Sequence, residues 1–210
     1  MSGEHAVVMT SGGLDSTVLL HWAISQGYRV TPLFLNYGQH CAQTELITLK
    51  SLLPSEVIAS LEIVDVSSVF RASPSRLIRE ANLWCDEVES DDLMLPYRNL
   101  FLLVTGAAFA SVRGASMLLS AFINSNHAYE LDATTTFLSG VESLIGRVGT
   151  VRIELPFRDL SKAKVVEIGL SLGVRVAETY SCQVNSFEHC GACPNCVERI
   201  SALRSAAPAE

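Results

Sequence analysis

The sequence is poor in charged residues and has no excess of positive charge. Charged side chains make up 18% of its 210 residues, and the formal net charge is -7. A protein that binds long nucleic acids through their phosphates is ordinarily basic. This balance argues against a long nucleic-acid partner and still leaves room for a small basic pocket that binds one nucleotide.

Long apolar runs are missing as well. The longest ones, such as residues 100–104, fall far short of the roughly 20 residues that a membrane span needs. Residues 6–9 are too short for the apolar part of a leader. We therefore expect a cytoplasmic protein with no membrane partner. Internal repeats and low-complexity tracts are not found, and 49% hydrophobic residues are enough for a sizeable core.

Short β-branched apolar runs alternate along the chain with longer amphipathic stretches. This alternation predicts an α/β fold in which a parallel sheet carries helices on both faces. We expect a helix cap at Ser161, and another at Asp132 or a nearby threonine. The expected strands are 5–10, 29–36, a part of 57–66, 116–122 and 151–155, and the expected helices are 15–26, 44–53, 99–113, 132–145 and 161–172.

Two segments interrupt this alternation. Residues 67–95 are long and acidic, which is typical of a solvated surface loop or of a lid. From residue 182 onward, closely spaced cysteines replace the alternation of strands and helices. We therefore divide the chain into an α/β domain at 1–180, a four-cysteine segment at 181–204 and a frayed tail at 205–210.

The most informative motif is SGGLDST at residues 11–17, directly after the first expected strand. Adjacent glycines let the backbone turn tightly and approach a ligand. The hydroxyls of Ser11, Ser16 and Thr17 and the N–H groups of a helix start would then form a cradle for an anion. The motif lacks the lysine of a Walker loop and the spacing of a dinucleotide fingerprint. The alternative interpretation is a polar turn with Asp15 stabilised near a helix N-terminus.

Four of the six cysteines fall within a short stretch near the C-terminus, namely Cys182, Cys190, Cys193 and Cys196. In a cytoplasmic chain this clustering favours a metal site over disulfides. Four thiolates suit tetrahedral zinc and leave no position open for a catalytic water, so we expect a structural zinc ion (Zn²⁺). An iron–sulfur cluster is the competing interpretation. Four buried free cysteines at this spacing would be unusual.

The two motifs together resemble one family. The S-G-G-x-D-S pattern is similar to the PP-loop of ATP pyrophosphatases, which transfer AMP to a substrate oxygen and release pyrophosphate. The whole chain resembles the QueC family of 7-cyano-7-deazaguanine synthases. Further matching segments are NYGQ at 36–39, YRNLFLL at 97–103, LSKAK at 160–164 and the C-terminal SC…HCGACPNCVERISAL.

The resemblance implies a Rossmann-like fold of the adenine nucleotide alpha hydrolase (HUP) type and an AMP-forming ligase. The implied partners are ATP, Mg²⁺ and a deazapurine carboxylate, 7-carboxy-7-deazaguanine. The carboxylate would become an acyl adenylate, ammonia would displace AMP to give an amide, and a second ATP would drive dehydration to the nitrile. A second copy of the chain is a further partner compatible with the resemblance.

The resemblance also assigns the site residues. The implied ATP-binding set is Ser11, Gly12, Gly13, Leu14, Asp15, Ser16, Thr17, Asn36, Tyr37, Gly38 and Gln39. The implied catalytic set is Asp15, Ser16, Lys162 and Arg98. The implied substrate-binding set is Arg98, Asn99, Asn124, Tyr129 and Asp132. The alternative interpretations are surface charge for Lys162 and Arg98 and a helix cap for Asn99.

The chain departs from the family on the acceptor side. QueC proteins usually carry a glycine-rich acidic segment that ends in S-G-Y-P-D-C-R. Over residues 120–132 this chain keeps at most Tyr129 and Asp132 of that segment, and Tyr97 stands where the family has glycine. An alternative is therefore a diverged QueC-like protein of an antiviral system, which would join the acid to a larger amine such as a protein N-terminus. A non-catalytic ATP-binding scaffold is the other alternative. The acidic balance disfavours related tRNA thiolases and lysidine synthases.

Overall fold

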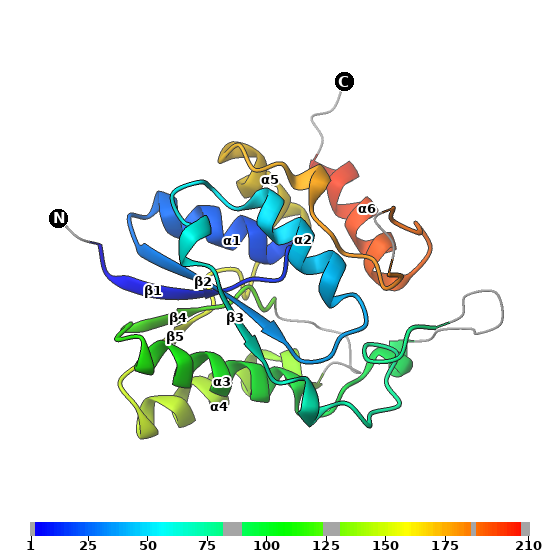
Figure 1. Cartoon of the computed structure of the whole chain (residues 1–210). Helices are drawn as coiled ribbons and strands as arrows, with labels where there is room; N and C mark the ends of the chain where they lie inside the picture. The colour runs from blue at the N-terminus through cyan, green and yellow to red at the C-terminus, as the bar shows by residue number, and fades with distance from the viewer. Residues whose placement is uncertain (1–2, 82–89, 124–130, 186–187, 207–210) are drawn as a thin grey trace.

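The computed structural model describes residues 3–81, 90–123, 131–185 and 188–206. Their strands form one parallel sheet in the order β3-β2-β1-β4-β5 (Figure 1). The strands are β1 (His5–Met9), β2 (Arg29–Asn36), β3 (Glu62–Asp65), β4 (Met117–Leu119) and β5 (Arg152–Glu154). The predicted parallel sheet is confirmed.

Helices cover both faces of this sheet, as predicted. In Figure 1, α1, α2, α5 and α6 lie on one face and α3 and α4 on the other. The α-helices are α1 (Leu14–Ser25), α2 (Ala42–Leu52), α3 (Arg98–Val112), α4 (Thr135–Val148), α5 (Lys162–Ser171) and α6 (Pro194–Ala206). The 3-10 helices are η1 (Ile58–Ser60), η2 (Ser67–Val69), η3 (Ser90–Leu93), η4 (Leu131–Ala133) and η5 (Val176–Glu178).

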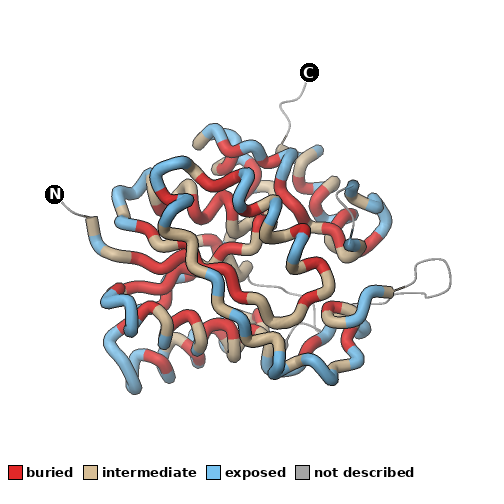
Figure 2. Tube along the Cα trace, viewed as in Figure 1, coloured by how far each residue is buried: buried red, intermediate tan, exposed pale blue. Residues whose placement is uncertain are grey.

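Two apolar clusters, one on each face, hold the helices to the sheet (Figure 2). The central strand β1 supplies both, because successive side chains of a strand point to opposite faces. Ala6 and Val8 pack in the cluster with α1 and α5, whereas Val7 packs in the cluster with α3 and α4. All three are fully buried, which explains why the sequence of this strand contains consecutive apolar residues.

The order of the strands reverses direction at β1. The chain first runs outward through β2 to β3, and then returns to place β4 on the opposite side of β1. In open parallel sheets, ligands bind at the carboxyl ends of the strands next to such a reversal. The SGGLDST motif directly follows β1 and therefore lies at this point.

Helix α3 lies unusually close to the sheet. A Cβ atom built on Gly106 would lie 3.0 Å from both terminal carbons of Leu118, so glycine allows the close approach. By length and composition alone, the stretch Asp91–Val112 could cross a membrane, with a mean hydropathy of 1.3. Core helices of soluble proteins pass the same test, and Leu103 and Ala110 of this helix are fully buried against the domain.

Element ends differ from the predicted ones in a few places. Ser161 caps α5 as predicted, and its hydroxyl accepts a hydrogen bond from the Lys164 N–H at 3.2 Å. Asp132 does not cap α4 but lies in η4, and Thr134 caps the helix by accepting from the Phe137 N–H. The fourth strand is shorter than predicted because its neighbour β5 already ends at residue 154.

Candidate functional site

The phosphate loop, residues 11–17, passes tightly against helix α2. Gly12 has φ +74, and a Cβ atom there would lie 2.5 Å from the Glu45 carbonyl oxygen. Both the backbone angle and the space therefore require glycine. Gly13 occupies the N-cap position of α1 and contributes no side-chain cap, so the first N–H groups of this helix remain available to an anion.

The hydroxyls of the loop bind one another across the turn. The oxygens of Ser11 and Ser16 lie 3.1 Å apart, and the Ser16 hydroxyl donates to the Gly13 carbonyl at 3.2 Å. The Ser11 N–H in turn donates to the Ser16 oxygen at 3.1 Å. The Thr17 hydroxyl is buried and has no hydrogen-bond partner in the described part of the chain. The loop is thus folded into shape before any ligand arrives.

Asp15 and Lys162 meet beside this loop, although they are far apart in the sequence. Asp15 lies in the first turn of α1 and Lys162 opens α5, and Lys162 Nζ is 3.4 Å from Asp15 Oδ2. Burial raises the pKa of the Asp15 carboxyl. Burial would lower the pKa of Lys162, but the carboxylates of Asp15 and Glu198 outweigh it and leave that pKa raised, so the ammonium stays charged.

The second oxygen of Asp15 fits the role of a cation ligand. Asp15 Oδ1 is buried and has no hydrogen-bond partner within the described residues. Buried polar atoms rarely stay unpaired in the functional state of a protein. A carboxylate oxygen beside an anion cradle is the kind of ligand that Mg²⁺ takes when it accompanies a nucleotide.

Two side chains that were predicted to bind ATP form hydrogen bonds that stabilise the turn after β2. The Gln39 side chain accepts from the Tyr37 N–H at 2.9 Å and donates to Glu45 at 2.8 Å. Asn36 accepts from the Gly38 N–H at 3.1 Å and donates to the Asp65 carboxylate at 2.8 Å. These side chains fix a turn at the carboxyl end of β2, which is the sheet edge where the phosphate loop also lies.

The predicted substrate residues are brought together at the start of α3. The guanidinium of Arg98 lies close to the Tyr37 hydroxyl and opposes the rise that burial causes in the pKa of Tyr37, and its Nε donates to the Asn99 side chain at 3.1 Å. Asn99 is buried and donates to the Asp132 carbonyl oxygen at 3.2 Å. The N-cap of α3 is Tyr97, so the alternative of Asn99 as the cap is wrong. Asn124 and Tyr129 lie outside the described residues.

Tyr97 adopts an unusual backbone conformation. Its φ is 66, in the left-handed region, and it is the only described residue other than glycine with positive φ. Its side chain is 78% exposed and so gains little from packing. Glycine avoids the steric cost of this conformation, which explains physically why a glycine would suit this position.

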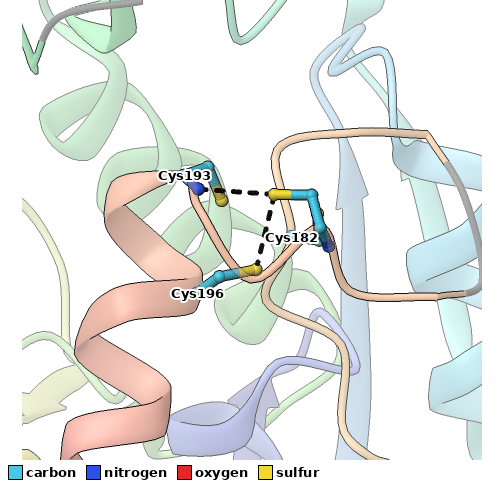
Figure 3. A group of neighbouring side chains, drawn as sticks. Cys182, Cys193 and Cys196 are labelled. Carbon is cyan, nitrogen blue, oxygen red and sulfur yellow. Dashed lines mark hydrogen bonds between the residues drawn. The ribbon is translucent and has the colours of Figure 1, made fainter. Parts of the chain in front are cut away.

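The four cysteines predicted as metal ligands converge. Their Sγ atoms all lie within 4.8 Å of one another, and Figure 3 shows Cys182, Cys193 and Cys196 pointing toward a common centre. Tetrahedral zinc with bonds of about 2.3 Å requires sulfur separations near 4 Å, and Cys190 and Cys196 are 3.9 Å apart. A hydrogen bond from Cys182 lowers the pKa of Cys193, which favours a thiolate there. The donor set therefore fits a tetrahedral metal ion.

The residue directly before the four-cysteine segment contacts the phosphate loop. The Tyr180 N–H donates to the Gly12 carbonyl at 2.9 Å. Arg199 of α6 is buried, and its guanidinium donates to the Val176 and Ala177 carbonyls at 2.7 and 3.0 Å. Because Tyr180 is also buried against Cys182, Cys193 and Cys196, it connects the cysteine cluster with the phosphate loop.

Two carboxylates in this region were not predicted as site residues. Glu198 of α6 accepts from Lys162 Nζ at 2.5 Å, and Glu45 of α2 contacts the turn after β2 through Gln39. Burial raises the pKa of Glu45. A glutamate on an expected helix ordinarily lies on a solvated face, so neither position carried a signal that distinguished it.

The structure describes part of the acidic segment 67–95, and hydrogen bonds hold this part in place. The Asp92 carbonyl accepts from the Arg76 N–H at 2.8 Å, and Glu80 accepts from the Asn185 N–H at 2.9 Å. The segment therefore contacts the four-cysteine segment. Residues 82–89, which include most of its predicted acidic run, lie outside the described residues.

Comparison with known proteins places the chain in a family. Residues 5–207 match the family model described as queuosine biosynthesis protein QueC. The chain therefore belongs to the QueC family. It is 32% identical over 206 residues to a 7-cyano-7-deazaguanine synthase of Caldicellulosiruptor bescii, covering 95% of this chain and 92% of that protein.

Solved structures with little sequence identity share the fold. A 4-thiouridine synthetase, in complex with RNA and bound ATP, is 17% identical with a TM-score of 0.55, over 97% of this chain and 50% of that one. The NMN synthetase from Francisella tularensis is 17% identical with a TM-score of 0.50, over 100% of this chain and 89% of that one. This likeness agrees with the PP-loop, HUP-type fold.

Proposed function

We propose that this member of the QueC family is an ATP-dependent ligase that adenylates the carboxylate of 7-carboxy-7-deazaguanine. The carboxylate oxygen would attack the α-phosphorus of ATP, release pyrophosphate and form an acyl adenylate. An amine would then attack the acyl carbon and displace AMP. With ammonia the product is the amide, and a second ATP would convert that amide into the nitrile, 7-cyano-7-deazaguanine.

The observation that carries this proposal is the preformed anion cradle. The similarity to a 7-cyano-7-deazaguanine synthase of Caldicellulosiruptor bescii supports it. Ser11 and Ser16 hold the loop in shape, and the missing side-chain cap at Gly13 leaves the first backbone N–H groups of α1 available to an anion. Lys162 adds a charged ammonium at the same place. Donors that are fixed in advance stabilise charge as it develops on the α-phosphate.

Mg²⁺, when bound with ATP, would supply a Lewis acid for the phosphate oxygens. Asp15 would hold it through the buried oxygen that lacks a partner. Lys162 would hold a phosphate oxygen as a point charge. In this arrangement the pyrophosphate portion of ATP lies over residues 11–17, and the adenosine extends toward the turn at 36–39.

The acid would bind at the start of α3. Arg98 is the cation available to a substrate carboxylate, and its contacts with Tyr37 and Asn99 fix the direction of the guanidinium. Asn124, Tyr129 and Asp132 would form the adjoining wall. Holding the acid at this edge of the sheet would bring its carboxylate toward the α-phosphate, as in-line attack requires.

A second candidate product is an amide to a larger amine, as expected for a QueC-like protein of an antiviral system. The observation that favours it is Tyr97, which keeps a glycine-like backbone and is 78% exposed beside the proposed acid site. A bulky residue there changes the entrance through which the amine must pass. The protein partner in this case would be the amine donor.

We propose further that the four cysteines bind one structural zinc ion per chain and that the protein is cytoplasmic, with a second copy of the chain as a candidate partner. The cluster is closed by its four sulfurs, and this donor set leaves no place for a catalytic water. Cys190 is exposed while Cys182 and Cys196 are buried, so loading from solution is sterically feasible. Iron is the alternative occupant, and elemental analysis separates the two.

The products decide between these alternatives. The protein is incubated with ATP, Mg²⁺, 7-carboxy-7-deazaguanine and ammonia, and the deazaguanine products are identified by mass spectrometry. Efficient formation of the nitrile supports the synthase. The amide alone, or an amide to an added peptide, supports the diverged function. The absence of any product, together with tight ATP binding, would leave the scaffold as the explanation.

A further inference from the structure

Lys162 is held by two carboxylates at once. Its Nζ lies 2.5 Å from Glu198 Oε2 and 3.4 Å from Asp15 Oδ2. One ammonium between two carboxylates leaves a net charge of minus one. A polyanion that approaches the phosphate loop therefore meets repulsion where the proposed function needs attraction.

The two carboxylates differ in how they are fixed. Asp15 is 24% exposed and belongs to the first turn of α1, whereas the Glu198 side chain is 59% exposed. The α6 backbone beside Glu198 is anchored by the buried Arg199 and by Cys196 of the cluster. The side chain of Glu198 can move while its backbone stays in place.

There is room for that movement. A cavity of about 660 Å³ lies between α5 and α6, and both Lys162 and Glu198 line it together with Pro194, Val197 and Ser201. A side chain that leaves Lys162 can therefore turn into solvent without displacing the helix. Glu198 is the solvent-exposed partner of this pair and can be hydrated when it leaves Lys162, so the exchange is readily reversed.

We propose that Glu198 is a specificity-determining residue that occupies Lys162 until a phosphate displaces it, and that it selects magnesium-bound ATP over free ATP. The inference depends on the proposed function, because it assumes that ATP binds at residues 11–17. Free ATP carries about four negative charges and its magnesium complex about two, so one extra carboxylate repels the free form more strongly. Glu198 would thus favour the form of ATP that can react.

The test measures ATP affinity by isothermal titration calorimetry, once with excess Mg²⁺ and once with EDTA. In Glu198→Gln, affinity for free ATP should rise by about tenfold and affinity for magnesium-bound ATP by about threefold. Glu198→Asp, which keeps the charge, should retain most of the wild-type preference for the magnesium complex. Glu167→Gln is the matched control, since Glu167 is exposed on α5 and pairs only with Lys164 among the ion pairs described for it. It should change either affinity by less than about twofold.

The same substitution made in a Lys162→Ala variant distinguishes a specific effect of Glu198 from a general loss of negative charge. In Lys162→Ala, the added change Glu198→Gln should give a smaller gain, because the competition for the ammonium is gone and only the repulsion by the Glu198 carboxylate remains to be removed. Equal gains in both backgrounds would overturn the proposal. So would weaker binding of magnesium-bound ATP by Glu198→Gln, which would make Glu198 a ligand of the metal.

Failure of the proposed function and failure of the role of Glu198 give different results. If ATP binds to none of these variants under either condition, the proposed function is wrong and this inference falls with it. If the wild type binds ATP and Glu198→Gln binds it no better, only the role of Glu198 is refuted. Thermal melting of each variant checks that it is folded before its affinity is compared.

Discussion

The nucleotide side and the acceptor side of this domain are built in different ways. The phosphate loop is closed by hydrogen bonds within residues 11–17 and is braced by α2, Tyr180 and Lys162. The acceptor side joins the turn after β2, the start of α3 and η4, with one strained residue at Tyr97. A preformed cradle can serve many acceptors, so the acceptor side is where specificity can change without loss of ATP chemistry.

The largest expected effect is on turnover. Asp15→Asn keeps the shape of the side chain but removes the charge that would hold Mg²⁺, so pyrophosphate release should fall by about 10³-fold. Asp159→Asn, at an exposed position, is the control and should retain near wild-type rates. An active Asp15→Asn variant would show that the nucleotide side does not work as proposed.

The next effect is on stability through the metal. Cys193→Ser should lose the bound ion and lower the free energy of unfolding by at least about 3 kcal/mol, because metal binding and folding are coupled. Ala192→Ser, an exposed neighbour, should leave both unchanged. Metal content by mass spectrometry and unfolding in urea measure the two quantities. A wild-type protein without metal and equally stable would refute the structural role.

A smaller loss should follow from the close approach of the phosphate loop to α2. Gly12→Ala should lower the free energy of unfolding by about 2 kcal/mol, since it combines an unfavourable φ with a backbone contact. Gly140→Ala is the matched control, because no atom lies within 4 Å of its added Cβ. In the α4 helix it should stabilise the protein by about 0.5 kcal/mol. Equal effects at both sites would argue against the tight fit.

The smallest expected effect concerns the acceptor side. Tyr97→Gly should raise the free energy of unfolding by about 0.5–1 kcal/mol, because glycine adopts the left-handed conformation without strain. Tyr97→Ala removes the ring and keeps the strain, so it should not show this gain. The same pair, assayed with ammonia and with a peptide amine, reports whether the ring affects the choice of amine. A shift with Tyr97→Gly alone would point to backbone conformation as the cause.

Much of the fold could be predicted because its signals are local. Continuous apolar strands such as β1 indicate a sheet buried on both faces, and Ser161 has the side chain that a helix cap needs. The cap of α4 was assigned less well, because Asp132 and Thr134 are both good caps and only the path of η4 decides between them.

The site was predicted as separate motifs, and their connections were not. The spacing of the cysteines indicated a metal cluster, and the two glycines indicated a tight loop. The contact of Lys162 with Glu198 joins two helices that are distant in the sequence, and no local pattern encodes that distance. The left-handed angle at Tyr97 was hidden because tyrosine seldom adopts it.

The fate of the phosphates of ATP tests the central claim most directly. The wild-type protein is mixed with ATP, Mg²⁺, 7-carboxy-7-deazaguanine and ammonia, and the nucleotide products are separated by ion-exchange chromatography. We predict AMP and pyrophosphate in equal amounts, formed only when the acid is present and lost in Lys162→Ala. ADP and inorganic phosphate as the products would contradict it.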